Sequence, residues 1–208
     1  MRVSEDRYNR DLRRVSLANR LIDHGVRTMW VSAWTGLKAR SVRNLNRSYR
    51  TGHKAALGIV GRPPKNPLSL LRSALLQNEA SALAGIAARY EILPKEPLPN
   101  AHRALPGLVL GETLCRAFDL YRTVVSGATF TMEQFMLLVV SLAERRVLVW
   151  EFCEGCRGVL VVDAAGARLR RCPTCRKIAA ETPEEQAIEP ADLPSTQPPE
   201  SHEQHSLF

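Results

Sequence analysis

Two cysteine pairs near the end of the chain have the spacing with the clearest chemistry. Cys153 and Cys156 belong to a C-E-G-C motif, and after fifteen further residues Cys172 and Cys175 form a C-P-T-C motif. Four thiolates at this spacing are the ligand set of a tetrahedral Zn²⁺ ion whose coordination positions are all filled. The sequence therefore predicts one structural zinc ion per chain, with no open position for water or a substrate.

Four cysteines can also serve chemistries other than zinc binding. An iron–sulfur cluster takes the same four thiolates, so it stays open as an alternative. Two disulfides would require an oxidising compartment, and the sequence shows no signal for one. A redox C-x-x-C motif usually accompanies a βαβ pattern, which the sequence lacks. Among these chemistries, the spacing favours structural zinc.

The residues around the cysteines predict a small β-hairpin. Residues 159–162 are apolar and mostly β-branched, residues 163–166 are typical of a turn, and residues 168–171 can form the returning strand. A further stretch with strand character, residues 147–152, leads directly into the first cysteine pair. A hairpin between two metal-binding turns is the shape of a zinc ribbon, which we predict for the region 147–180.

Positive charge is concentrated in the first third of the chain. The formal net charge of the 208 residues is +8. Residues 1–72 contain sixteen Lys or Arg against four acidic residues, a net charge of +12, whereas the remainder has a net charge of −4. Arginine gathered in this way is the electrostatic footprint of a nucleic-acid-binding region. The competing interpretation, a solvated basic face, usually mixes both signs of charge.

The same basic region predicts three short helices. The first covers residues 15–23 and ends at His24-Gly25, the second contains residues 29–31 and ends at Thr35-Gly36, and the third runs from residue 38 to about residue 50. In a helix-turn-helix the backbones cross closely, so that a small residue is needed there and glycine suits the turn. Ser32 and Gly36 match these roles, and the pair is tied to the first helix by apolar side chains: Val31, Leu37, Val42 and Leu45. We therefore predict a helix-turn-helix-like unit in residues 1–60.

The open face of the third predicted helix carries side chains that can donate to DNA. The N-terminal residues of a recognition helix read base edges, and the predicted base contacts are Lys38, Arg40, Ser41 and Asn44. The predicted phosphate contacts are Arg43, Arg47 and Arg50. A second DNA-contact surface is predicted beside the cysteines, where simple solubilising charge is the alternative; it comprises Arg168, Arg170, Arg171, Arg176 and Lys177.

A proline-rich segment, residues 61–67, separates the basic region from a helical region at residues 68–146. Its three prolines preclude a helix and favour an extended linker. Helices are predicted at residues 68–90, at residues 107–125 and from the capping box Thr131-Gln134 to about residue 145. Their apolar stripes most simply build a core or a partner interface. The predicted fold class is therefore mostly α, with a helix-turn-helix-like N-terminal domain, a helical middle and a C-terminal four-cysteine, zinc-ribbon-like β-hairpin.

The ends of the chain predict a cytoplasmic protein with a disordered tail. Residues 181–208 contain five prolines and seven acidic residues but no Lys or Arg, so they cannot bury enough apolar area to order themselves. The longest nearly apolar run, residues 135–143, is shorter than the roughly 20 residues that a bilayer requires. The N-terminus lacks the apolar region of a signal peptide. We expect no membrane association.

The order of these features resembles a known family. The stretch LIDHGVRTMWVSAWTGLKARSVRNLNRSY, the segment GRPPKNPL, a helical middle and a four-cysteine segment follow one another as in the FlhC family of bacterial flagellar master regulators. The likeness covers roughly residues 14–177, and the order of the motifs is more specific than either motif alone. The acidic tail is outside the likeness, and the gap between the cysteine pairs can differ among such proteins.

The resemblance implies a DNA-binding transcription activator of flagellar genes. It would act in complex with FlhD subunits, as a hetero-oligomer that the family suggests is a heterohexamer, at promoters with RNA polymerase. Its structural zinc ion would be held by Cys153, Cys156, Cys172 and Cys175. We do not expect an enzyme, because the sequence offers no open metal position with an acid or base in reach. An RNA-binding or polymerase-associated zinc-ribbon protein stays open as the alternative function.

Overall fold

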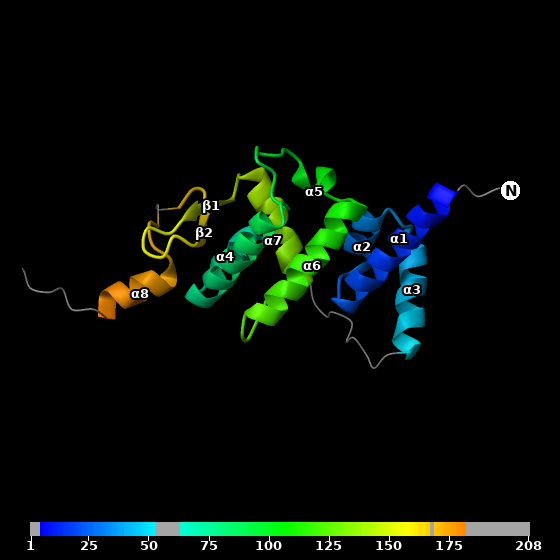
Figure 1. The fold of residues 1–208 in the computed structure, drawn as a ribbon, viewed down its shortest axis with the longest axis horizontal. Coiled ribbons are helices and arrows are strands. Elements are labelled where there is room, and N and C mark those ends of the chain that lie inside the picture. The colour runs from blue at the N-terminus through cyan, green and yellow to red at the C-terminus, as the bar shows by residue number, and fades with distance from the viewer. Residues whose placement is uncertain (1–4, 53–62, 167–168, 182–208) are drawn as a thin grey trace, which may run out of the picture.

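Helices make up most of the computed structural model, which describes residues 5–52, 63–166 and 169–181. Figure 1 shows an elongated molecule with α1, α2 and α3 at one end and α8 at the other. This confirms the mostly helical class predicted from the sequence. The described elements are α1 (Glu5–Asp23), α2 (Thr28–Thr35), α3 (Ala39–Gly52), the 3₁₀ helix η1 (Pro67–Leu71), α4 (Ala74–Arg89), α5 (Ala101–Ala104), α6 (Leu108–Val124), α7 (Met132–Glu144), β1 (Leu148–Phe152), β2 (Val159–Asp163) and α8 (Pro173–Glu181).

The first two N-terminal helices end where glycines permit a left-handed turn. Gly25 follows α1 with φ of 75°, and Gly36 caps α2 with φ of 70°, its N–H donating to the Ser32 carbonyl oxygen at 2.9 Å. The Ser32 hydroxyl then donates to the Leu37 carbonyl oxygen at 2.6 Å, which fixes the chain between α2 and α3. The predicted ends of these two helices are therefore confirmed, although α1 begins ten residues before the predicted start.

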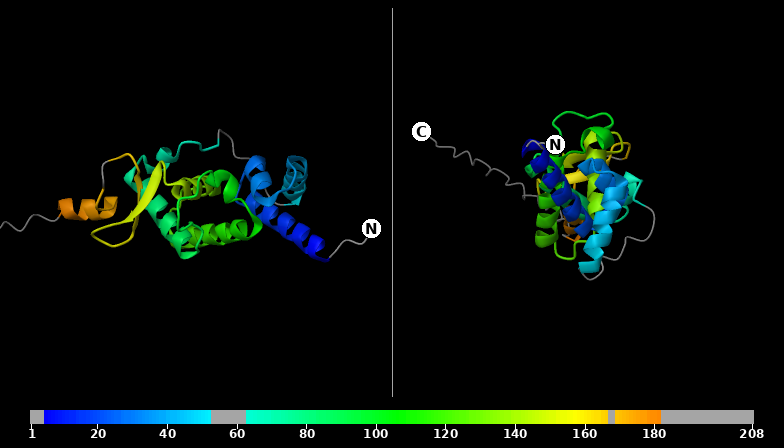
Figure 2. Two further views of the ribbon diagram at one scale, coloured as in Figure 1. Left: turned by 90° about the horizontal axis from the view of Figure 1, so that it is seen from above. Right: turned by 90° about the vertical axis from the view of Figure 1, so that its right-hand side faces the viewer.

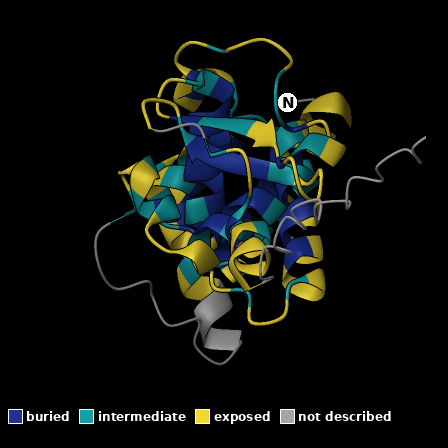
Figure 3. Cartoon of the chain, turned by 90° about the vertical axis from the view of Figure 1, so that its left-hand side faces the viewer, coloured by how far each residue is buried: buried dark blue, intermediate teal, exposed yellow. Residues whose placement is uncertain are grey.

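The first two N-terminal helices pack directly on α6. At Gly111 of α6 an added Cβ would lie 2.6 Å from Leu17 Cδ2, so only glycine lets α6 approach α1 this closely. Arg13 binds Glu112 through two hydrogen bonds of 3.1 and 2.9 Å. One hydrophobic cluster joins residues of both regions, and Figure 3 shows the buried positions gathered in the middle of the molecule. The basic region thus shares a core with the helical region, and their division at residues 61–67 stays a prediction.

The predicted continuous helix at residues 68–90 is wrong, because its first part is a separate 3₁₀ helix and the chain breaks at Ser73. The Asn66 side chain accepts from the Leu68 N–H at 3.0 Å and starts the 3₁₀ helix η1. Ser73 then adopts an extended conformation, with φ of −135° and ψ of 160°, and its hydroxyl accepts from the Leu76 N–H at 3.2 Å. Each side chain satisfies a free backbone donor at a helix start, so that η1 and α4 form as separate elements.

The capping box predicted ahead of α7 is confirmed. The Thr131 hydroxyl accepts from the Gln134 N–H at 3.2 Å, and the Gln134 side chain accepts from the Thr131 N–H at 2.7 Å. The helix that follows is buried along most of its length, including Phe135, Leu138 and Leu142. Met132–Glu144 therefore forms a buried helix on which β1, η1, α4 and α5 pack.

A buried carboxylate holds the connection between α6 and α7. Glu79 of α4 accepts hydrogen bonds from the Tyr121 hydroxyl, from the Thr129 N–H at 2.8 Å and from the Thr129 hydroxyl at 2.9 Å. Burial alone would raise the pKa of Glu79, but these hydrogen bonds lower it below its ordinary value. Burial and the bond to Glu79 raise the pKa of Tyr121 to about 12. The ionised Glu79 thus anchors this loop, which sequence patterns did not reveal.

The two strands form an antiparallel hairpin, but with a different partner from the predicted one. Strand β1 pairs with β2 from Leu148↔Asp163 to Phe152↔Val159, whereas we predicted that residues 159–162 would pair with residues 168–171. The other edge of β2 is occupied by α4, where the Gln77 side chain donates to the Val161 carbonyl oxygen and the Ser81 hydroxyl accepts from the Val161 N–H, both at 3.0 Å. These two side chains occupy the groups that a returning strand would need.

The C-terminal part of the described chain ends with α8. Glu181, which we predicted to begin the disordered tail, is the last residue of this helix, and residues 182–208 lie outside the described part. None of the described helices combines the length and the apolar character needed to cross a membrane.

Candidate metal centre and nucleic-acid interface

The structure brings the four predicted cysteine ligands together. Cys153 and Cys156 lie in the turn that joins β1 to β2, and Cys172 and Cys175 lie at the start of α8. All four Sγ atoms are within 4.8 Å of one another, and those of Cys156 and Cys172 are 3.9 Å apart. A tetrahedral ion with metal–sulfur bonds of about 2.3 Å requires sulfur–sulfur separations of about 3.8 Å. The cluster is therefore positioned to hold a metal ion.

Backbone hydrogen bonds and one glycine shape the turn that carries the first cysteine pair. The Cys153 N–H donates to the Gly158 carbonyl oxygen, and the Arg157 N–H donates to the Cys153 carbonyl oxygen, both at 2.9 Å. Arg157 adopts a left-handed conformation with φ of 60° to close this turn. A Cβ added at Gly155 would lie 2.9 Å from Cys175 Sγ, so the absence of a side chain there lets the second pair approach the first.

Backbone amides also determine which thiol ionises first. The Cys172 N–H donates to Cys153 Sγ at 3.2 Å, and the Cys175 N–H donates to Cys172 Sγ at 3.4 Å. Amide donors, first from Cys156 and then from Cys172, lower the pKa of Cys153 to about 6. Hydrogen bonding to Cys172 and burial raise the pKa of Cys175 to about 12. All five cysteines of the chain lie in the described part and none forms a disulfide; Cys115, far from the cluster in sequence, is buried.

The basic residues predicted beside the cysteines are exposed where the structure describes them. Arg170 pairs with Glu154 at 3.8 Å, and Lys177 pairs with Glu181 at 3.7 Å. Arg171 borders a hollow of about 290 Å³ beside Cys175. Arg176 is exposed on α8, and Arg168 lies outside the described residues. Two of these cations are thus already paired with acidic side chains, and their contact with DNA stays a prediction.

The face predicted to contact DNA lies on α3 at the opposite end of the molecule (Figure 1). Val42 is 1% exposed and anchors the helix to the core. The predicted contacts on and just before α3 are exposed: Lys38, Arg40, Ser41, Arg43, Asn44 and Arg47. Arg50 belongs to α3, but its side chain lies outside the described part of the chain. The structure therefore places six of the seven predicted side chains on the surface of this unit.

The exposed face of α3 has two different borders. Ser41 and Asn44 line a groove of about 500 Å³ between α1 and α3, together with the apolar side chains of Val15, Leu37 and Leu45. The arginines of α3 do not line this groove. Three arginines thus lie on the open side of the helix, while two of the predicted base contacts line a groove that also contains Asp11. Sequence reasoning did not find this groove, because it depends on how α1 crosses α3.

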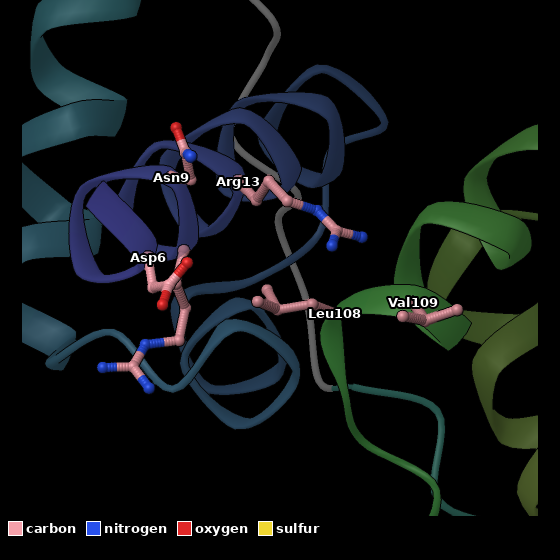
Figure 4. A pocket seen from close by; sticks show the side chains of 6 residues that line it. Asp6, Asn9, Arg13, Leu108 and Val109 are labelled. Atoms are coloured by element: carbon pink, nitrogen blue, oxygen red, sulfur yellow. The ribbon is translucent and has the colours of Figure 1, made fainter. Parts of the chain in front are cut away.

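A second groove, shown in Figure 4, separates α1 from the start of α6. It measures about 450 Å³ and is lined by Asp6, Asn9, Arg10, Arg13, Leu108 and Val109. The first nine residues of α1 are all exposed, and the left view of Figure 2 shows that this part of the helix projects from the molecule. Tyr8 and Leu12 lie on it one turn apart, 63% and 56% exposed. Their four-residue spacing was the signal in the sequence that this helix starts before residue 15.

Two comparisons with known proteins found no match. No protein-family model matches the sequence, and the search of curated proteins finds no match.

Proposed function

We propose that the protein is a zinc-containing, DNA-binding transcription activator of the FlhC type. In this proposal it acts on flagellar genes together with FlhD subunits, at promoters with RNA polymerase. The observation that carries the proposal is the row of exposed arginines Arg40, Arg43 and Arg47 on α3. They stand in a region of strongly positive net charge, as phosphate-binding surfaces do.

In the proposed interface α2 and α3 act as a helix-turn-helix. Gly36, with its left-handed conformation, forms the turn, and the hydrogen bond between Ser32 and Leu37 fixes the crossing. This leaves α3 to enter the major groove with its first turns, where Lys38 and Arg40 meet base edges. Arg43 and Arg47 neutralise phosphates and release counterions, so the affinity falls steeply with salt.

Zinc is the metal that the proposal assigns to the cysteine cluster. Four thiolates around one ion form a closed structural site, which leaves no position for catalysis. An iron–sulfur cluster distributes its cysteines over several irons and would hold sulfurs on different irons further apart than 4.8 Å, the distance within which all four Sγ atoms lie. The bound ion would join the β1–β2 turn to α8, so metal binding and folding of this segment are coupled.

The proposed FlhD partner is supported by the exposed apolar side chains of α1. Tyr8 and Leu12 lie one helical turn apart on the projecting part of α1, and Val109 is 68% exposed beside the groove of Figure 4. Large apolar side chains grouped on one helix are typical of a helix-packing interface. The N-terminal half of α1 would then carry a subunit contact.

Duplex binding is the decisive test. The full-length chain, co-expressed with an FlhD-like partner, is titrated with labelled promoter duplex at several salt concentrations. We expect the triple variant Arg40→Ala, Arg43→Ala, Arg47→Ala to lose roughly a hundredfold in affinity and, because it removes two phosphate contacts, to reduce the salt slope by about 2.

The matched control removes three exposed arginines from other elements: Arg89→Ala, Arg103→Ala and Arg146→Ala. The net charge changes equally, so the control should keep most of the affinity. An equal loss in both triple variants would show that only overall charge matters and would remove the support for an interface on α3.

A further inference from the structure

An exposed aromatic pair marks the strand that leads into the cysteine cluster. Phe152, the last residue of β1, is 61% exposed. The ring of Trp150 meets it edge-on, with a centroid distance of 5.6 Å and an interplanar angle of 90°. The Trp150 side chain is half-buried and packs against the hydrophobic core. One ring is thus packed against the core and contacts the other, most of which is exposed at the surface.

The backbone around Phe152 is held on both sides. Phe152 pairs with Val159 in the hairpin, and the next residue, Cys153, belongs to the four-thiol cluster. The Gly85 backbone of α4 packs against Val159: a Cβ added at Gly85 would lie 3.7 Å from Val159 Cγ2. A ring held in this way loses little conformational freedom when a ligand stacks on it.

Positive charge follows this ring in the chain, after the exposed Glu154. Arg157 occupies the turn that joins Phe152 to Val159, and its side chain is exposed. Beyond the turn follow the exposed Arg171 and Arg176, which form no ion pair with other described residues. An exposed ring that is followed in the chain by exposed arginines offers a stacking surface for a base and cations for the phosphates of the same strand.

We propose that Phe152, supported by Trp150 and flanked by Arg157, is a stacking site for an unpaired nucleic-acid strand. The ligand class is single-stranded DNA or RNA, since every base offers a π-face and stacking is tolerant of sequence. This site is separate from α3, which lies at the other end of the molecule (Figure 1). It therefore does not depend on the proposed duplex-binding function, and the two sites can hold paired and unpaired segments at the same time.

The test measures the binding of short single strands to the full-length, metal-loaded chain by fluorescence anisotropy. The probes are labelled DNA and RNA strands of about ten nucleotides, and an abasic DNA strand of the same length. We expect Phe152→Leu to weaken binding of the base-containing strands about tenfold, because leucine keeps apolar area without a π-face. Phe152→Tyr should restore binding, and the abasic strand should bind the unchanged protein as weakly as normal strands bind Phe152→Leu.

Two further measurements separate this site from the other features of the molecule. The metal content of each variant shows whether the cysteine cluster is intact. If Phe152→Leu loses metal, the binding of the abasic strand and of Phe152→Tyr decides whether the ring at position 152 stacks on bases. The triple α3 variant should bind single strands normally, even if duplex binding fails. The proposal is overturned if Phe152→Leu binds as tightly as the unchanged protein, if abasic and normal strands bind equally, or if the α3 variant abolishes single-strand binding.

Discussion

The two ends of the molecule are held together in different ways. At one end α3 rests on buried apolar side chains, since Val31, Trp34 and Val42 are each no more than 1% exposed. At the other end every residue of α8 except Pro173 is exposed or half-buried. The four thiols lie at the start of α8. A side-chain hydrogen bond joins this helix to α4, from the Asn78 amide to the Thr174 hydroxyl at 3.1 Å. Apolar burial stabilises the end that contains α3. The end that contains α8 has little apolar burial, so we expect its stability to depend on a metal ion held by the four cysteines.

This difference means that the two ends can be disturbed separately. A helix anchored in the hydrophobic core keeps its shape without any ligand. A short segment with little buried apolar area requires a cross-link or a metal to stay folded. Loss of metal should therefore change the cysteine end without changing the arginine face of α3.

The largest effect is expected from removing the metal. Chelation, or the substitution Cys172→Ser, should unfold the β1–β2 turn and α8, because the metal contributes several kcal/mol or more, up to about 10–16 kcal/mol in isolated zinc fingers. Amide hydrogen exchange should show that protection is lost in α8 but kept in α1, α2 and α3, and also in β2, which β1 and α4 hold in place. Cys115→Ala is the matched control, since this buried cysteine lies outside the cluster and the variant should keep its metal. Equal loss of protection at both ends would contradict the comparison.

An intermediate effect is expected from two alanine substitutions at glycines. Gly155→Ala would place a Cβ 2.9 Å from Cys175 Sγ and should lower metal affinity, whereas Gly111→Ala would place one 2.6 Å from Leu17 Cδ2. Overpacking of this kind costs about 1–3 kcal/mol. Gly111→Ala should therefore reduce the free energy of unfolding while the metal affinity stays the same. Metal titration and urea unfolding measure the two effects.

The control for both glycine substitutions is Gly107→Ala. Its added Cβ would have nothing closer than the Leu105 carbonyl oxygen at 3.9 Å. If Gly111→Ala weakened metal binding as much as Gly155→Ala, the two ends would be coupled through the core rather than independent.

The smallest effect is expected from the buried carboxylate of the helical body. The pKa of Glu79 is lower in the folded state than its ordinary value of 4.5. Its stabilising contribution is therefore complete above that unfolded-state pKa and is lost as the pH falls through the lower folded-state pKa. Glu79→Gln should cost about 0.5–1.5 kcal/mol at neutral pH, because the glutamine carbonyl oxygen can still accept some of these hydrogen bonds, and it should flatten the acid limb of the stability curve. Urea unfolding over a pH series measures this, with the exposed Glu96→Gln as control; an unchanged acid limb would contradict the role of Glu79.

The parts of the fold that depend on local chemistry could be predicted from the sequence. The capping box at Thr131, the stop at Gly36 and the four cysteine ligands each follow from residues close together in the chain or from their spacing. The hydrogen bonds at a helix end depend on residues a few positions apart, and a set of metal ligands has a characteristic spacing. Both can therefore be recognised in the sequence.

The parts that depend on distant residues could not be predicted in this way. The partner of β2 was predicted wrongly because Gln77 and Ser81, which lie 84 and 80 positions before Val161 in the chain, occupy its other edge. The break before α4 depends on Ser73 taking an extended conformation in the middle of an apolar pattern. The grooves beside α1 and the buried Glu79 arise only when helices cross, so no periodicity in the sequence indicates them.

The way α4 covers the outer edge of β2 has a consequence for the behaviour of the protein in concentrated solution. The run from Val159 to Val162 is apolar and rich in valine, which is the composition that recruits further chains into stacked β-structure. An amide and a hydroxyl from a neighbouring helix occupy the backbone groups of Val161 to which such a chain would bind. Helix α4 thus prevents another chain from pairing with this edge of β2. Replacing both Gln77 and Ser81 with alanine would leave the edge open to aggregation.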